Sequence, residues 1–314
     1  MILRHMPPLN QESFRSWFYR HWGRENCVVS ARTRHAEYPL FQQRLSIKAA
    51  WDGSEDYFVD GRRVAVNEDT YLILNDGRTY GSSLSSHTPV SSFAIFFRPG
   101  MAAEVLRAHT TTPEKLLEEP HEVTSGAVEF SERVRPHDRS ISPVLRFIYR
   151  NVEAGISDEH WLEEQLYFLL ERMHMLHLQD MHSTQLLPSR RASTRRELFR
   201  RLGRCVDYMH SHYQRQLGLA EIAAAAPLSR YHCLRLFKAL HGITPAVYLN
   251  NLRVRVAGRL LRRAEVSVDQ AAAHVGFESR TTLFRHMKRI HARAPSALRL
   301  QAAPEGQDEG EGKS

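Results

Sequence analysis

The 314-residue sequence predicts a two-domain α+β protein, in which a small β-sheet domain followed by helices precedes an all-α domain. Short segments with an apolar residue at every second position recur about every ten residues before residue 100, as in a sandwich or small barrel. One helical pattern occurs twice between residues 219 and 299. Residues 190–300 hold 22 Lys/Arg and 6 Asp/Glu, or +16, which leaves −8 for the rest of a chain whose total is +8. A basic C-terminal part indicates a polyanionic partner, although an Arg-rich solvated surface gives the same count.

The strands of the first domain are expected between about residues 25 and 100. Two sets of alternating apolar residues each share one face of a strand: Leu45, Ile47, Ala49 and Trp51, and Phe93, Ile95 and Phe97. Asp60 and Gly61 lie between two β-rich segments, and they predict a type I′ hairpin because both turn residues need a positive φ. These features predict a sandwich or small barrel.

A small barrel can enclose one small ligand. The aromatic residues expected near such a cavity are Trp51, Tyr57, Tyr71, Tyr80 and Phe93. The alternative is that they only fill the core. Five basic residues of the same region can bind a carboxylate effector or be scattered surface charge: Arg44, Lys48, Arg62, Arg63 and Arg78.

Helices are predicted for the rest of a first domain that spans residues 1–182, over residues 101–182 and also over 13–22. The segment 157–180 carries an apolar stripe at helical spacing, made of Leu162, Leu166, Leu169, Met173 and Leu176. This stripe packs against the sheet or forms a dimer seam, and the two can coexist. Residues 183–195 are rich in Ser, Pro and Arg and are predicted to be a linker.

Several classes of protein are disfavoured. His174, His177 and His182 have spacings that fit no standard metal site, so we expect them to face solvent. The first 100 residues contain no HxH pair, and we find no Ser/His/Asp motif and no paired-carboxylate motif, so the sequence predicts no metal, no cofactor and no enzyme activity. The three cysteines form no CxxC pair, which fits a reducing compartment. Without a signal-peptide pattern or a run of 18 apolar residues, the protein is expected in the cytoplasm and not at a membrane.

The repeated pattern has the form of a helix-turn-helix: a helix of small residues, a tight turn, a Ser cap and a more polar second helix. Ser229 and Ser279 are the expected caps, and Gly276 supplies the second turn. Residues 196–300 are therefore predicted to be a DNA-binding domain with two such motifs, followed by a disordered tail over 301–314. DNA binding predicts that the protein associates with the bacterial nucleoid.

Each second helix exposes residues that can contact DNA. The candidates are Arg230, Tyr231, Leu234, Arg235 and Lys238 in the first motif, and Arg280, Thr281, Thr282, Arg285 and Arg289 in the second. Arg235 and Arg285 are expected to read bases, since Arg can contact guanine O6 and N7 together. Lys238, Lys288 and Arg289 are expected to contact phosphates, which position the protein without reading sequence.

A long helix is predicted between the motifs, with Thr244 as cap and Pro245 at its first position. About 20 residues at a rise of 1.5 Å span roughly 30 Å, close to the ~34 Å of one turn of B-DNA. This length predicts that the two reading helices enter successive major grooves, at an asymmetric site of about two turns per monomer.

Two segments, GITPAVYLNNLRVRVAGRLL and SVDQAAAHVGFESRTTLFRHMKRIHARAPSALR, resemble the signature of AraC/XylS-family transcription regulators. The resemblance implies base-reading roles for Tyr231, Leu234, Arg235, Arg280, Thr281 and Arg285. Leu234 departs from the polar residues common at its position and can touch a thymine methyl. Phe284, a large apolar residue on the outward side, has no explanation from the sequence.

The N-terminal part resembles the cupin-type barrels that many of these regulators carry. Tyr80 stands where a metal-binding cupin has a later histidine, which argues against a metallo-oxygenase. The resemblance implies a homodimer that binds promoter DNA, with a small-molecule effector and RNA polymerase as possible partners. The alternatives are a regulator whose barrel only dimerises and, third, a cupin-type enzyme with a DNA-binding appendage.

Overall fold

The chain divides into two compact units, Met1–Asp207 and Tyr208–Ser314, in a computed structural model of the protein. The structure describes residues 1–8, 11–13, 16, 21, 24–112, 118, 128–262 and 266–291. Most of the predicted helix at 13–22, and all of the predicted disordered tail at 301–314, lie outside the described residues.

The first unit contains one eight-stranded sheet in which β1, β2, β7, β3, β6 and β8 are neighbours in that order. The strands are β1 (Ile2–Leu3), β2 (Cys27–Gln42), β3 (Ser46–Trp51), β4 (Ser54–Val59), β5 (Arg62–Asn67), β6 (Thr70–Leu74), β7 (Thr79–Phe96) and β8 (Val134–Pro136). Asp60 and Gly61 have φ of 51° and 70° between β4 and β5, which confirms the predicted positive-φ hairpin turn.

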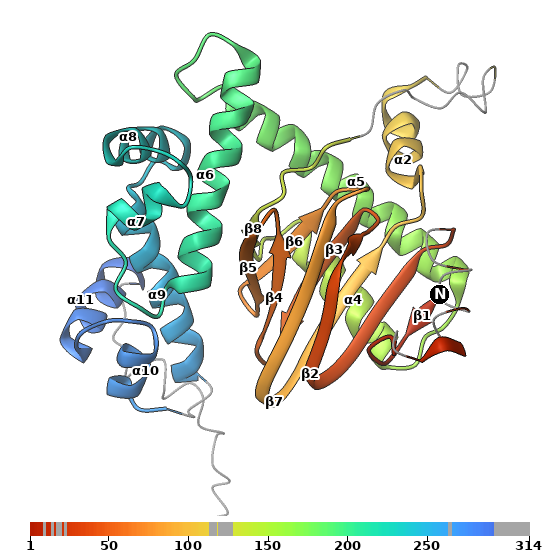
Figure 1. Ribbon diagram of the computed structural model, residues 1–314, viewed down its shortest axis with the longest axis horizontal. Helices are drawn as coiled ribbons and strands as arrows, with labels where there is room; N and C mark the ends of the chain where they lie inside the picture. Colours follow the sequence, from red (N-terminus) through yellow and green to blue (C-terminus); the bar gives the residue numbers. More distant parts are fainter. Residues whose placement is uncertain are drawn as a thin grey trace, which may run out of the picture. The chain divides into compact units, whose positions relative to one another are not determined.

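Strand β7 organises the sheet because it is paired along both edges (Figure 1). One edge pairs with β2 over nearly the full length of both strands. Along the other edge, residues 91–96 pair with β3 and residues 80–83 pair with β4. The sheet therefore divides into a β3-β6-β8 part and a β4-β5 part, and among the described strands no ladder closes it into a complete barrel.

One face of the sheet is covered by the helices α2 (Met101–Thr110), α4 (Ser142–Glu153) and α5 (Glu159–Thr184) (Figure 1). The alternation predicted for residues 45–51 and 93–97 is confirmed, because both sets lie in the core beneath these helices. The stripe from Leu162 to Leu176 packs into the same core, and its first four members are at most 2% exposed. These side chains are therefore part of the core packing of the first unit.

The prediction that His174 faces solvent is wrong. This side chain is buried next to Met173 on α5, and its ring lies 5.8 Å from that of Phe130. Burial lowers the pKa of His174 to about 4, since the charged imidazolium is costly away from water. Among the described residues, no three His, Cys, Asp or Glu side chains gather into a group that could hold a metal ion.

The helices extend into the predicted linker from both sides. Helix α5 ends at Thr184 and α6 (Ala192–His212) begins before the predicted end of the linker at residue 195. The Arg195 guanidinium donates to the carbonyls of Ser189 (2.7 Å) and Arg190 (3.0 Å), so an arginine assigned to the linker instead holds the turn before α6.

The second unit begins within α6 and contains α7 (Leu219–Ala224), α8 (Arg230–His241), α9 (Pro245–Arg262), α10 (Val268–His274) and α11 (Arg280–His291). Helix α9 lies against all four of the others. The alanines Ala271 and Ala272 of α10 are buried against its apolar side, where small residues permit close approach. No helix in the described ranges combines the length and the apolar character that a membrane crossing needs.

Candidate nucleic-acid interface

Helix α8 separates an inward apolar side from an outward basic side. The Ser229 hydroxyl accepts from the His232 N–H at 3.2 Å, which confirms the predicted cap and fixes where the helix begins. Cys233, Leu236 and Phe237 are at most 3% exposed and pack inward. The five candidate DNA contacts of this helix, Arg230, Tyr231, Leu234, Arg235 and Lys238, are all exposed.

Two of these outward residues support one another. Tyr231 is 70% exposed, and the Arg235 guanidinium carbon lies 6.0 Å from the centre of its ring. This i, i+4 pair leaves the guanidinium N–H groups available at the helix surface. The aromatic ring thus restricts where the arginine points.

Helix α11 repeats this arrangement. Ser279 accepts from the Thr282 N–H at 3.3 Å, and the two hydroxyl oxygens lie 3.2 Å apart. Thr282 is therefore engaged at the start of the helix and only half-exposed, whereas Arg280, Thr281, Arg285 and Arg289 are exposed. Arg280 lies 3.9 Å from the Asp269 carboxylate, and both side chains are 69% exposed, so the contact is weak.

Phe284, which the sequence left unexplained, lies within this surface. It is 41% exposed and lines a hollow of about 580 Å³ together with Val268, Arg280, Thr281 and Arg285. Leu234 holds the equivalent position in α8, directly before an arginine, and is 38% exposed. Each outward face therefore carries a large apolar side chain directly before an arginine. The two copies of the sequence repeat have this pair at matching positions.

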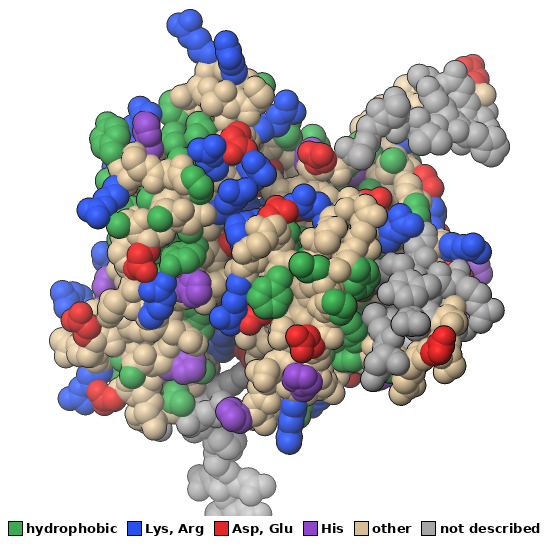
Figure 2. All heavy atoms as spheres, viewed as in Figure 1, with side chains coloured by type: hydrophobic (Ala, Val, Ile, Leu, Met, Phe, Trp, Pro, Cys, Tyr) green, Lys and Arg blue, Asp and Glu red, His purple; other side chains and the backbone are tan. Residues whose placement is uncertain are grey.

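Neither outward helix carries an acidic residue, α8 from Arg230 to His241 or α11 from Arg280 to His291. Figure 2 shows blue Lys and Arg side chains over both helices on the visible face. Exposed cations without carboxylates on the same helix favour a polyanionic partner.

A further functional residue, Arg253, was missed by sequence reasoning. It lies within the apolar stripe of α9, is 5% exposed, and donates to the carbonyls of Tyr213 (2.8 Å) and Arg215 (2.7 Å). Its guanidinium carbon lies 5.5 Å from the ring centre of Phe277. Arg253 thus connects the segment after α6 to the second motif. The sequence signal for this role was a single arginine within an apolar stripe.

Gly276 is the second connection between these segments. Its φ is +81°, and a Cβ there would lie 2.5 Å from the carbonyl oxygen of Gln214 and 2.8 Å from that of Tyr213. Gln216 donates to the Gly276 carbonyl at 3.2 Å. The turn of the second motif is therefore in close backbone contact with the chain that leads into the first.

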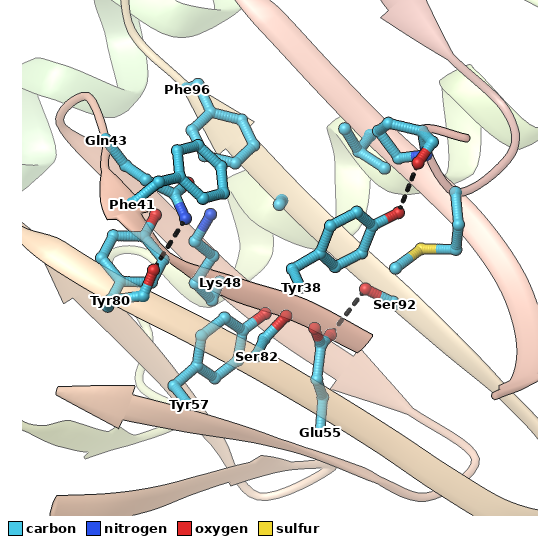
Figure 3. Close-up of a pocket in the computed structure, with 14 residues that line it drawn as sticks. Tyr38, Phe41, Gln43, Lys48, Glu55, Tyr57, Tyr80, Ser82, Ser92 and Phe96 are labelled. Atoms are coloured by element: carbon cyan, nitrogen blue, oxygen red, sulfur yellow. Dashed lines mark hydrogen bonds between the residues drawn. The ribbon is translucent and has the colours of Figure 1, made fainter. Parts of the chain in front are cut away.

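The first unit contains a cavity on the sheet face opposite the helices (Figure 3). Tyr57 and Tyr80 line it, as expected for cavity aromatics, whereas Trp51, Tyr71 and Phe93 lie in the helix-covered core. The reason is strand parity. Successive side chains point to opposite faces, so the cavity receives Lys48 from β3 and Ser92, Ala94 and Phe96 from β7.

Residues 222–301 match the family model described as a helix-turn-helix domain. An uncharacterized HTH-type transcriptional regulator from Bacillus subtilis, YdeC, is 34% identical over 79 residues, which cover 25% of this chain and 27% of that protein. The C-terminal domain is an AraC-type helix-turn-helix domain.

Two solved structures resemble the AraC-type domain. The DNA-binding domain of AdpA, solved in complex with a target DNA, is 34% identical and covers 32% of this chain and 89% of that one, with a TM-score of 0.31. A regulator with an AraC-type DNA-binding domain from Chromobacterium violaceum is 28% identical and covers 34% and 95%, with a TM-score of 0.32. The matches to the curated relatives span only about a third of the relatives' length.

Proposed function

We propose that this protein is a sequence-specific, DNA-binding transcription regulator of the AraC/XylS type. The observation that carries the proposal is the pair of acid-free, Arg-bearing outward faces on α8 and α11, held on one connecting helix. Helix α9 has 18 residues, or about 27 Å, close to one turn of duplex DNA at ~34 Å. This span supports insertion of the two outward helices into successive major grooves.

Each outward helix is assigned a mixed reading mode. Arg235 and Arg285 contact guanine edges, and the neighbouring Leu234 and Phe284 contact thymine methyl groups, which are the apolar feature of the major groove. Lys238 and Arg289 lie further along their helices and contact phosphates. The predicted site is therefore a guanine next to a thymine, repeated about one turn away.

The test is to replace Arg235 or Arg285 by Ala and to measure binding to the selected site and to random DNA. Each change is expected to weaken specific binding by about 1–3 kcal/mol and to leave non-specific binding nearly unchanged. Lys238→Ala is the matched control, since loss of a phosphate contact weakens both to a similar degree. Equal losses on both DNAs for the arginine variants would contradict base reading.

The first unit is proposed to be a cupin-like domain that senses a small-molecule effector in the cavity of Figure 3. Ligand binding there would shift a population already present between DNA-binding states. Support comes from the buried polar groups that line the cavity, since apolar side chains alone would suffice for a core.

We further propose that the protein acts as a homodimer through the outer face of α5. The apolar stripe of α5 that the sequence predicted as a possible dimer seam packs against the sheet. The opposite face of the helix exposes four large apolar side chains, Phe168, Met175, Leu178 and Met181. Four large apolar side chains along one helix are more than scattered surface residues require. RNA polymerase is the further partner expected of a regulator that activates.

A further inference from the structure

Lys48 is a buried amine at the centre of the sheet cavity. It is 2% exposed, and its Nζ lies 3.4 Å from the ring centre of Phe96 and 5.3 Å from that of Tyr80. Within the described part of the chain, it makes no hydrogen bond and no ion pair. A cation held against aromatic rings without an oxygen partner is costly, so an amine at this position calls for a function.

The composition makes this position distinctive. The chain has 5 Lys and 38 Arg, yet the basic residue placed in the cavity is a lysine. The other four basic candidates of the sheet region, Arg44, Arg62, Arg63 and Arg78, each lie within 4.0 Å of a carboxylate. Arginine stays protonated in proteins, whereas a buried lysine can lose its proton and act as a nucleophile.

Burial lowers the pKa of Lys48 well below its usual range, and the nearby Glu55 carboxylate opposes this only in part. Glu55 is itself 2% exposed and accepts from the Ser92 hydroxyl at 2.7 Å. Figure 3 shows the Lys48 amine and the Glu55 carboxylate reaching into the same cavity. The site therefore contains a nucleophile and a group that can carry a proton.

The size of the cavity restricts what it can hold. Its volume is about 60 Å³. Because an apolar cavity of about 150 Å³ holds the six carbons of benzene, roughly two or three non-hydrogen atoms can enter here. The walls are mainly aromatic and aliphatic, so the body of the ligand is apolar.

We propose that Lys48 captures a short aliphatic aldehyde as an imine, and that this is the effector chemistry of the first unit. The neutral amine adds to the carbonyl carbon and forms a C–N bond. The carbonyl oxygen then leaves as water, carrying both protons of the amine nitrogen, and Glu55 relays one of them. No oxidant or reductant is needed, and the dry cavity slows hydrolysis of the product. The inference rests on the proposed effector-sensing role.

The test is reductive trapping with acetaldehyde and sodium cyanoborohydride at pH 7, followed by peptide mass spectrometry. Lys238 and Lys288 are exposed and serve as comparison sites in the same molecule. An exposed lysine is almost fully protonated at pH 7, so Lys48 should gain an ethyl group at least about tenfold faster. This preference should disappear in urea, where every lysine is exposed. Slower trapping at Lys48 than at the exposed lysines would overturn the proposal.

Two variants separate covalent capture from simple anion binding. Lys48→Met keeps the length and apolar character of the side chain, and Lys48→Arg keeps the charge but cannot form the imine. Acetaldehyde without reductant should raise the melting temperature of the wild type and of neither variant. If acetate instead stabilises both the wild type and Lys48→Arg, the cavity is a non-covalent anion site and the proposal fails.

None of these measurements uses DNA. Equal losses on specific and random DNA in the arginine variants would therefore contradict base reading by the proposed regulator and leave the trapping result intact. Failure of trapping would in turn leave the assignment of the DNA-binding faces unchanged.

Discussion

Gly276 lies where the turn of the second motif meets the backbone that follows α6. Its positive φ and the carbonyls of Tyr213 and Gln214 each oppose a side chain at this position. The residue therefore has two separate reasons to be glycine, one conformational and one steric.

We expect Gly276→Ala to lower the free energy of unfolding by at least about 2 kcal/mol, measured by urea denaturation of the full chain. Gly242→Ala is the matched control, because Gly242 also has a positive φ (+71°) but nothing lies within 4 Å of its added Cβ. That variant should lose only about 1 kcal/mol, the conformational part. Equal losses would show that the close backbone contact contributes nothing.

The proposed contact between Phe284 and a thymine methyl group can be tested by changing either the DNA or the protein. Replacing thymine by uracil in the bound site removes only the methyl group. For the wild type this should weaken binding by about 1 kcal/mol at one position of the half-site read by α11. Phe284→Ala should be weaker on the thymine site and should not respond to uracil. A full uracil effect in the variant would assign the methyl contact to another residue.

At the scale of single elements, α5 has two apolar faces with different roles. The face that contains Leu166 and Leu169 is fully buried in the first unit, so it stabilises the fold. The face that contains Phe168 and Met175 has no covering element among the described residues. A helix that is apolar on both sides is typical of an interface as well as a core.

The double change Met175→Glu and Leu178→Glu is expected to shift the protein from dimer to monomer in sedimentation velocity experiments, because charges are costly in an apolar interface. Gln179→Glu, on an already polar and exposed position of the same helix, should leave the dimer intact. A monomeric wild type would refute the proposed dimer, and a dimer that tolerates the double change would place the interface elsewhere.

At the scale of the whole molecule, the AraC-type domain should cover an asymmetric site. A footprint of roughly 20 base pairs per monomer is expected, since two reading helices at the ends of α9 enter grooves one turn apart. Hydroxyl-radical footprinting on one half-site measures this directly. Protection confined to half a turn would mean that only one motif engages.

The second unit was largely predictable from sequence because its signals are local. Ser229, Ser279 and Pro245 mark where helices begin, and apolar spacing marks which sides are buried. Arg253 was missed because its partners, Tyr213 and Arg215, are 40 and 38 residues away. No local pattern shows that a charged side chain in an apolar stripe will find carbonyl acceptors.

The cavity was only half predictable. Alternation correctly separated the two faces of the strands, but which face the helices would cover depends on long-range packing. Trp51 and Phe93 were therefore expected in a cavity that contains Lys48 and Glu55 instead. The small residues Ser92 and Ala94, which leave room beside larger neighbours, were the signal to follow.

The contacts made by Arg253 and Gly276 have a consequence for the genes that such a protein controls. Because these contacts and α9 hold the two motifs as one body, the distance between the two bound sequences cannot adjust. Inserting one base pair between the two bound sequences rotates the second sequence by about 35° around the DNA axis. That sequence then no longer faces the helix that would read it. Operators of the proposed regulator should therefore vary through base substitution while the length of the spacer stays constant.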